Sequence, residues 1–117
     1  MSDIKSRLYK GYRIQERSDG VVDVYDDEGN FSQLPLHYDL CQHSPTGFNW
    51  GYGGSGPTQL AFSLLYDVTE NQKVAHSNAQ NFKWDVLARI PTDDDWQMTF
   101  EEINDWLIEN SKETRNE

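Results

Sequence analysis

Hydrophobic and polar residues alternate in the first third of the chain, as they do in half-buried β-strands. In the segment LYKGYRIQER, which starts at position 8, the apolar residues that share one parity are Leu8, Tyr12 and Ile14. Turn residues at 18–20 lead into VVDVY at 21–25, and a second turn at 26–30 leads into FSQLP at 31–35. The pattern therefore predicts two or three short strands in an antiparallel meander, which ends at the proline of the last segment.

After residue 56 the apolar residues recur every three or four positions, which predicts helices. Pro57 is expected at the first position of the first helix, where its missing amide hydrogen costs nothing. The second helix is expected to run from 70–72 to Arg89. Within it Asp85 and Arg89 are spaced for an ion pair, and Pro91 ends the helix.

The third helix has the clearest start signal. Thr99 is expected to cap it, and Glu102, three residues later, completes a capping box. Met98 is placed to pack against Ile103 across the first turn. The residues expected to face inward are Phe100, Ile103, Trp106 and Leu107.

These elements predict an α+β fold with a short N-terminal antiparallel β-meander of two to three strands packed against about three α-helices. The segment 36–56 has no clear period and is expected to form an ordered loop packed by its aromatic residues, Tyr38, Phe48, Trp50 and Tyr52. A length of 117 residues suits a single domain, 1–117, with an ordered core at about 8–110 and a polar tail at 111–117.

Composition indicates a cytoplasmic protein. No stretch of the sequence approaches the roughly 18 apolar residues that span a bilayer, and the N-terminal residues lack the apolar core of a signal peptide. Cys41 is the single cysteine, so an intrachain disulfide is excluded and a reducing compartment is favoured.

The charge of the chain is strongly acidic, with 20 acids, 10 bases and a formal net charge of −10. Such a surface repels nucleic-acid phosphates and attracts a basic protein surface. The acids concentrate from position 93 onward, where the candidate partner-binding residues are Asp93, Asp94, Asp95, Glu101, Asp105 and Glu109. The alternative is that these charges serve solubility alone.

The loop FNWGYGGSGPT, from position 48, is a candidate site for a small anionic ligand. Backbone amides before a helix N-terminus can bind a phosphate or carboxylate, and aromatic residues beside them can stack on a ring. The candidate ligand-binding residues are Trp50, Tyr52, Gly53, Gly54, Ser55, Gly56 and Thr58. The loop lacks the lysine of a phosphate-binding NTPase loop, and Pro57 stands where a nucleophile elbow around Ser55 needs glycine. Alternatively, the glycines only let the loop pass close to the aromatic rings.

Residues of types that can bind a metal occur near the middle of the chain, where His37, Cys41 and His43 lie within seven residues. Their spacing matches no zinc-finger pattern, so no metal or cofactor is expected, although the sequence leaves open whether the three converge. The acidic run DVYDDEG lacks the spacing of a calcium loop. His76 lies inside the second helix with no evident partner. No residue has a spacing that indicates a catalytic role, which favours a non-enzymatic protein.

Several segments together resemble a known family. They are YKGYR, GFNWGYGGSGPTQLAFSLLYD and FKWDVLARIP, followed by a short tryptophan-containing segment and a final helix. This arrangement is similar to small bacterial and phage proteins classed only as a domain of unknown function, with the motif F-x-W-G-Y-G-G-S-G-P-x-Q-L-A. The resemblance covers about residues 8–108. It implies a single α+β domain and a phage or mobile-element setting, and it implies no catalytic residue.

Two functions follow as expectations. The first is a non-enzymatic accessory or inhibitory protein of phage or mobile-element type, which binds a basic protein surface through its acidic C-terminal region. The alternative is a protein that binds a nucleotide or other anion through the Gly51–Thr58 loop.

Overall fold

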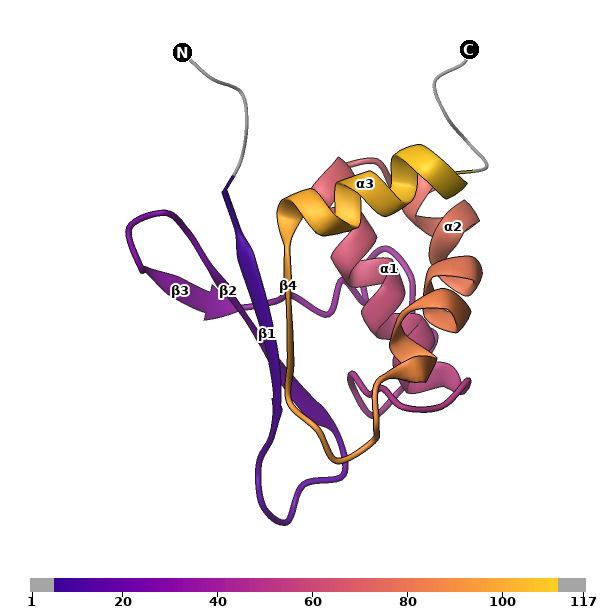
Figure 1. The fold of residues 1–117 in the computed structure, drawn as a ribbon. Coiled ribbons are helices and arrows are strands. Elements are labelled where there is room, and N and C mark those ends of the chain that lie inside the picture. The colour runs from indigo at the N-terminus through magenta and orange to yellow at the C-terminus, as the bar shows by residue number, and fades with distance from the viewer. Residues whose placement is uncertain (1–5, 112–117) are drawn as a thin grey trace.

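The computed structural model describes residues 6–111, and apart from Ser111 the expected polar tail lies outside them. Four strands and three α-helices form the fold (Figure 1). The strands are β1 (Leu8–Arg13), β2 (Gly20–Tyr25), β3 (Phe31–Gln33) and β4 (Trp96–Thr99). The helices are α1 (Ser55–Thr69), α2 (Gln72–Asp85) and α3 (Phe100–Asn110), with a short 3-10 turn, η1, at Leu87–Arg89. The predicted α+β fold is confirmed.

The sheet has the order β3-β2-β1-β4 with antiparallel pairing throughout. β1 is therefore an inner strand, and its Leu8 pairs with Tyr25 of β2 on one side and Thr99 of β4 on the other. The sequence pattern predicted at most three strands and missed β4. That strand runs directly into α3, and its partner β1 lies more than 80 residues earlier, so no hairpin turn marks it in the sequence.

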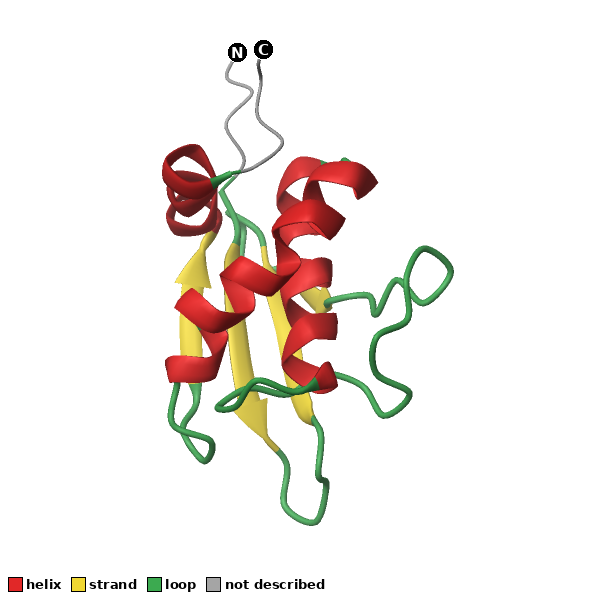
Figure 2. Cartoon of the chain, turned by 90° about the vertical axis from the view of Figure 1, so that its right-hand side faces the viewer, coloured by secondary structure: helices red, strands yellow, loops and turns green. Residues whose placement is uncertain are grey.

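The helices cover one face of the sheet. α1 and α2 pack against each other over this face, and α3 follows β4 directly and crosses beyond the end of the sheet (Figure 2). The shared parity of Leu8, Tyr12 and Ile14 predicted that these residues form the inward face of β1, and this was wrong. The opposite face is turned inward: Tyr9 is fully buried, whereas Ile14 is 40% exposed. Gly11 also faces inward, and it has no side chain because the ring of Trp96 fills that space.

Two helix boundaries differ from the prediction. α1 begins at Ser55, so Pro57 occupies the third helical position, which still needs no amide hydrogen. α2 ends at Asp85, because Val86 departs from helical geometry at φ −121° and ψ −59°. The expected ion pair within one helix therefore does not form, and Asp85 instead accepts a hydrogen bond from the indole N–H of Trp106 at 3.0 Å.

The N-terminus of α3 has the predicted capping box. The Thr99 hydroxyl accepts the amide hydrogen of Glu102 at 3.0 Å, and the Glu102 carboxylate accepts that of Thr99 at 2.9 Å. Ile103 and Leu107 are buried below it, and Phe100 and Trp106 pack partly against the core.

Replacing Thr99 by alanine is expected to lower the free energy of unfolding by about 1 kcal/mol, because the amide hydrogen of Glu102 loses its acceptor and half of the capping box is removed. Urea denaturation measures the loss. Thr99→Ser is the control, since it keeps the hydroxyl and should retain most of the stability. Equal losses in the two variants would assign the effect to the methyl group instead.

The core lies between the sheet and the helices and also receives the 36–56 loop. Its largest fully buried aromatic side chains are Trp50, Tyr9, Phe62 and Phe82. The predicted packing of the loop by its aromatic residues holds for Phe48 and Trp50, whereas Tyr52 is 46% exposed. Among residues 6–111, no helix has both the length and the apolar character needed to cross a membrane.

Candidate functional site

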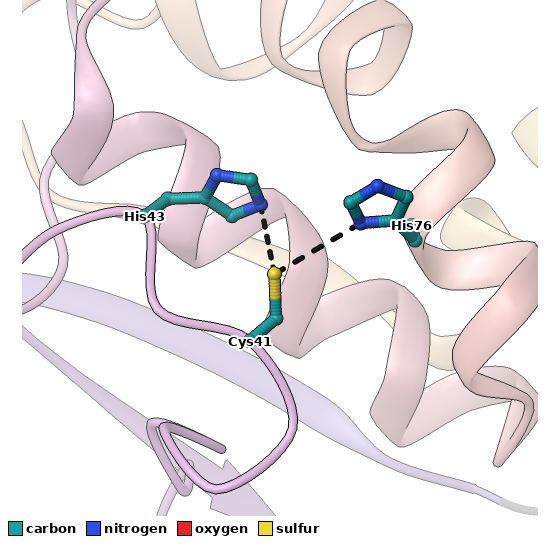
Figure 3. Close-up of side chains that lie close together, drawn as sticks. All are labelled: Cys41, His43 and His76. Carbon is teal, nitrogen blue, oxygen red and sulfur yellow. Dashed lines mark hydrogen bonds between the residues drawn. The ribbon is translucent and has the colours of Figure 1, made fainter.

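Three side chains with metal-ligand chemistry meet where the 36–56 loop passes α2 (Figure 3). The Sγ of Cys41 lies 3.1 Å from Nε2 of His43 and 3.9 Å from Nδ1 of His76. The three ligand atoms all lie within 4.8 Å of one another, and the two imidazole rings stack with their centroids 6.0 Å apart. We call Cys41, His43 and His76 the thiol–imidazole cluster.

The cluster differs in one residue from the three candidate metal ligands of the sequence, which were His37, Cys41 and His43. His37 points elsewhere, with its ring edge against Tyr66 at a centroid distance of 4.8 Å. Its Nε2 is buried without a hydrogen-bond partner among the described residues. His76 takes its place beside Cys41 and His43. Sequence reasoning missed this histidine because its partners lie more than 30 residues away, and no local spacing connects a loop to a later helix.

Gln59, a fully buried residue of α1, holds the backbone of the loop that carries the cluster. Its side-chain oxygen accepts the amide hydrogens of His43 and Ser44 at 2.6 and 3.1 Å. Its side-chain nitrogen donates to the carbonyls of Leu36 and Cys41 at 2.8 and 3.0 Å. One amide side chain thus fixes the chain on both sides of the thiol.

The surroundings set the proton state of these groups. Burial raises the pKa of the Cys41 thiol, so the free sulfur keeps its proton near neutral pH. Burial, together with the charges of His76 and Lys83, lowers the pKa of His43, so its ring stays neutral with one nitrogen lone pair available. A nucleophilic cysteine needs a lowered thiol pKa. Without a metal the cluster therefore suits hydrogen bonding better than covalent catalysis, and a metal ion bound here would have to displace the thiol proton.

The glycines of the 51–56 loop lie against large side chains. A Cβ added at Gly53 would come within 2.0 Å of the Trp84 ring, and one at Gly54 within 2.5 Å of the Tyr52 ring. The carbonyl oxygen of Gly53 also accepts a hydrogen bond from the ammonium group of Lys83 at 2.9 Å. These contacts account for glycine at both positions without a ligand.

The other loop candidates are distributed between core and surface. Trp50 is fully buried and offers no free ring face, whereas Tyr52 is 46% exposed. Ser55 is exposed, but Gly56 and Thr58 are buried at the start of α1. The Thr58 hydroxyl is occupied within the helix, because it donates to the Gly54 carbonyl at 3.0 Å. Anion binding by this loop stays a prediction, and of its two candidate aromatic residues Tyr52 is the accessible one.

The acidic candidates separate into two groups. Residues 93–95 precede β4, whereas Glu101, Asp105 and Glu109 follow it on α3, so the strand lies between them (Figure 1). All six are exposed. The α3 acids recur every four residues and therefore lie along one side of the helix.

An acidic groove lies beside the first two turns of α3. It has a volume of about 860 Å³, and its carboxylates come from Asp26 and Asp27 in the β2–β3 turn and from Glu101 and Asp105 of α3. Its apolar lining residues are Leu8, Tyr25 and Phe100. Sequence reasoning missed the two turn aspartates, which it tested only as calcium ligands.

One family model, described as a family of unknown function, matches residues 9–109. The match covers most of the chain, in agreement with the resemblance to a small uncharacterised domain. No curated protein and no solved structure matches the chain.

Proposed function

The chain belongs to this family, DUF6166, and we propose that it binds a basic segment of another protein in the acidic groove beside α3. In this proposal the protein is a cytoplasmic, non-enzymatic accessory or inhibitory factor of the phage or mobile-element type. The observation that carries it is the meeting of four carboxylates from two distant segments around one groove.

The charge of the groove supports a basic occupant. Arg7 also lines it, but its guanidinium is 2.6 Å from the Asp67 carboxylate, which offsets the positive charge. The four groove carboxylates therefore dominate the local potential. They would attract lysine and arginine side chains and repel phosphates, and they are part of a chain whose net charge is −10.

The lining of the groove narrows the class of partner. Leu8, Tyr25 and Phe100 provide apolar surface beside the carboxylates. Lysine and arginine carry long aliphatic stems that pack on apolar surface while their charged ends reach polar groups. A basic segment with interspersed apolar residues fits this combination better than a polycation without them.

A matched pair of double variants tests the proposal. Glu101→Gln with Asp105→Asn removes two groove charges, and Asp93→Asn with Asp95→Asn removes two charges at the other end of β4. The probe is a short synthetic peptide rich in lysine, arginine and leucine, with binding followed by fluorescence anisotropy. The groove variant is expected to bind roughly tenfold more weakly, at about 0.7 kcal/mol for each exposed pair.

Salt provides a second readout of the same peptide binding. Raising the ionic strength from about 0.01 M to about 0.15 M shortens the screening length from about 30 Å to about 8 Å, so wild-type affinity should fall steeply. Thermal melting confirms that each variant remains folded. Equal weakening by both double variants would show that net charge alone attracts the peptide, and the groove would lose its role.

A further inference from the structure

We propose that the thiol–imidazole cluster is a zinc site in which Cys41, His43 and His76 are the protein ligands and a fourth coordination position is open to solvent. Zinc favours thiolate and imidazole ligands, and three protein ligands with one open position are typical of zinc sites that also bind water or a substrate group. The site is separate from the acidic groove, so this proposal does not depend on the proposed function.

The distances in the cluster are close to those that zinc requires. Bond lengths of about 2.3 Å to sulfur and about 2.0 Å to nitrogen place sulfur and nitrogen ligands about 3.5 Å apart in a tetrahedral site. The observed separations from Cys41 Sγ, 3.1 Å to His43 and 3.9 Å to His76, lie on either side of this value. The remaining nitrogen–nitrogen separation, at most 4.8 Å, has to shorten to about 3.3 Å. Rotation of the exposed His76 side chain can supply this change.

A hydrogen-bonded cluster without a metal explains the arrangement less completely. A thiol has one hydrogen, so Cys41 can donate to only one of the two ring nitrogens, and its sulfur is a weak acceptor for an N–H of the other ring. The structure nevertheless directs a ring nitrogen from each histidine toward the same sulfur (Figure 3). A zinc ion bound to the thiolate satisfies all three groups at once.

The scaffold holds two of the ligands in place before any ion binds. The side chain of Gln59, which is fully buried in α1, donates a hydrogen bond to the carbonyl of Cys41 and accepts one from the amide of His43. His76 projects from α2, whose Ala75 and Ala79 are buried against the core. Because the backbone of this loop and the backbone of α2 are already fixed, ion binding has to order only side chains. The half-buried sulfur and the exposed His76 leave a route for the ion from solvent.

Cobalt(II) is a suitable probe of the purified full chain, because it takes the same ligands as zinc and absorbs light where zinc does not. After removal of metals with a chelator, cobalt titration should give a thiolate-to-cobalt charge-transfer band that saturates at one ion per chain. Zinc added afterwards should displace cobalt and abolish the band. Cys41→Ser should abolish the band outright, and His76→Ala should weaken binding at least tenfold.

His37→Ala is the matched control, because it removes a histidine of the same loop that points toward Tyr66 instead of Cys41. It should leave the band and the affinity unchanged, and the melting temperature of each variant without metal verifies folding. Absence of a charge-transfer band in the wild type would overturn the proposal. So would full binding by His76→Ala, or losses in His37→Ala equal to those in His76→Ala, because either result would contradict this ligand set.

Discussion

Replacing Trp50 by alanine is expected to lower the free energy of unfolding by about 3–5 kcal/mol, a large part of the stability of a domain this size. Trp50 is fully buried, and its indole N–H donates to the Asp94 carbonyl at 3.0 Å. The Arg13 guanidinium lies over its ring at 4.1 Å, and Trp96 meets the ring edge-on at 5.6 Å. Alanine would leave a cavity and remove the partner of a backbone carbonyl. Chemical denaturation followed by circular dichroism measures the effect.

Trp84→Ala is the matched control for this prediction. Trp84 is 56% exposed, although its ring contacts Lys83 and the loop beside it. Removing it deletes the same number of atoms from a largely solvated position, so the loss should stay below about 1 kcal/mol. Similar losses in the two variants would contradict the central role assigned to Trp50 in the core.

Asp67→Ala is the second large effect, with an expected loss of about 2–3 kcal/mol. The Asp67 carboxylate accepts the hydroxyl hydrogen of Tyr9 at 2.6 Å and pairs with Arg7 at 2.6 Å. Burial, reinforced by the hydrogen bond to Asp67, raises the pKa of Tyr9 far above its usual value. The hydroxyl therefore remains a donor at any moderate pH, and without Asp67 it would be buried with no acceptor. Urea denaturation at neutral pH gives the loss.

Asp19→Ala is the control for the Asp67 prediction. Asp19 also pairs with an arginine at 2.6 Å, but its partner Arg17 is 48% exposed, whereas the partners of Asp67 are the more buried Arg7 and the fully buried Tyr9. Exposed pairs contribute little because water and salt screen them, so this variant should lose less than about 1 kcal/mol. If both variants lost equally little, the buried Tyr9 hydroxyl would have found another partner and the argument for Asp67 would be wrong.

The sequence correctly predicted those structural features that depend on residues close together in the chain. The capping box of α3 involves Thr99 and Glu102, three residues apart, and both of its hydrogen bonds form as predicted. The inward face of β1 was not predictable in this way. Tyr9 is fully buried, and the acceptor that satisfies its hydroxyl is Asp67, a residue 58 positions later, which no strand pattern can indicate.

The acidic groove could not be predicted either, because strands far apart in the sequence pair to form it. Asp26 follows Tyr25, and Glu101 lies two residues after Thr99. Tyr25 and Thr99 both pair with Leu8, one on each side, so the sheet brings the two acidic segments to the same end. The sequence showed both segments as acidic but gave no reason to join them.

The inner position of β1 also affects the order in which the chain can fold during synthesis. β1 and β2 can pair as soon as they leave the ribosome, because a short turn connects them. The other side of β1 pairs with β4, which begins at Trp96 and emerges only after both long helices. Until β4 has emerged, the backbone donors and acceptors along this side of β1 stay unpaired and can pair with another chain. Truncation before residue 96 should therefore leave a chain that aggregates instead of a smaller folded domain.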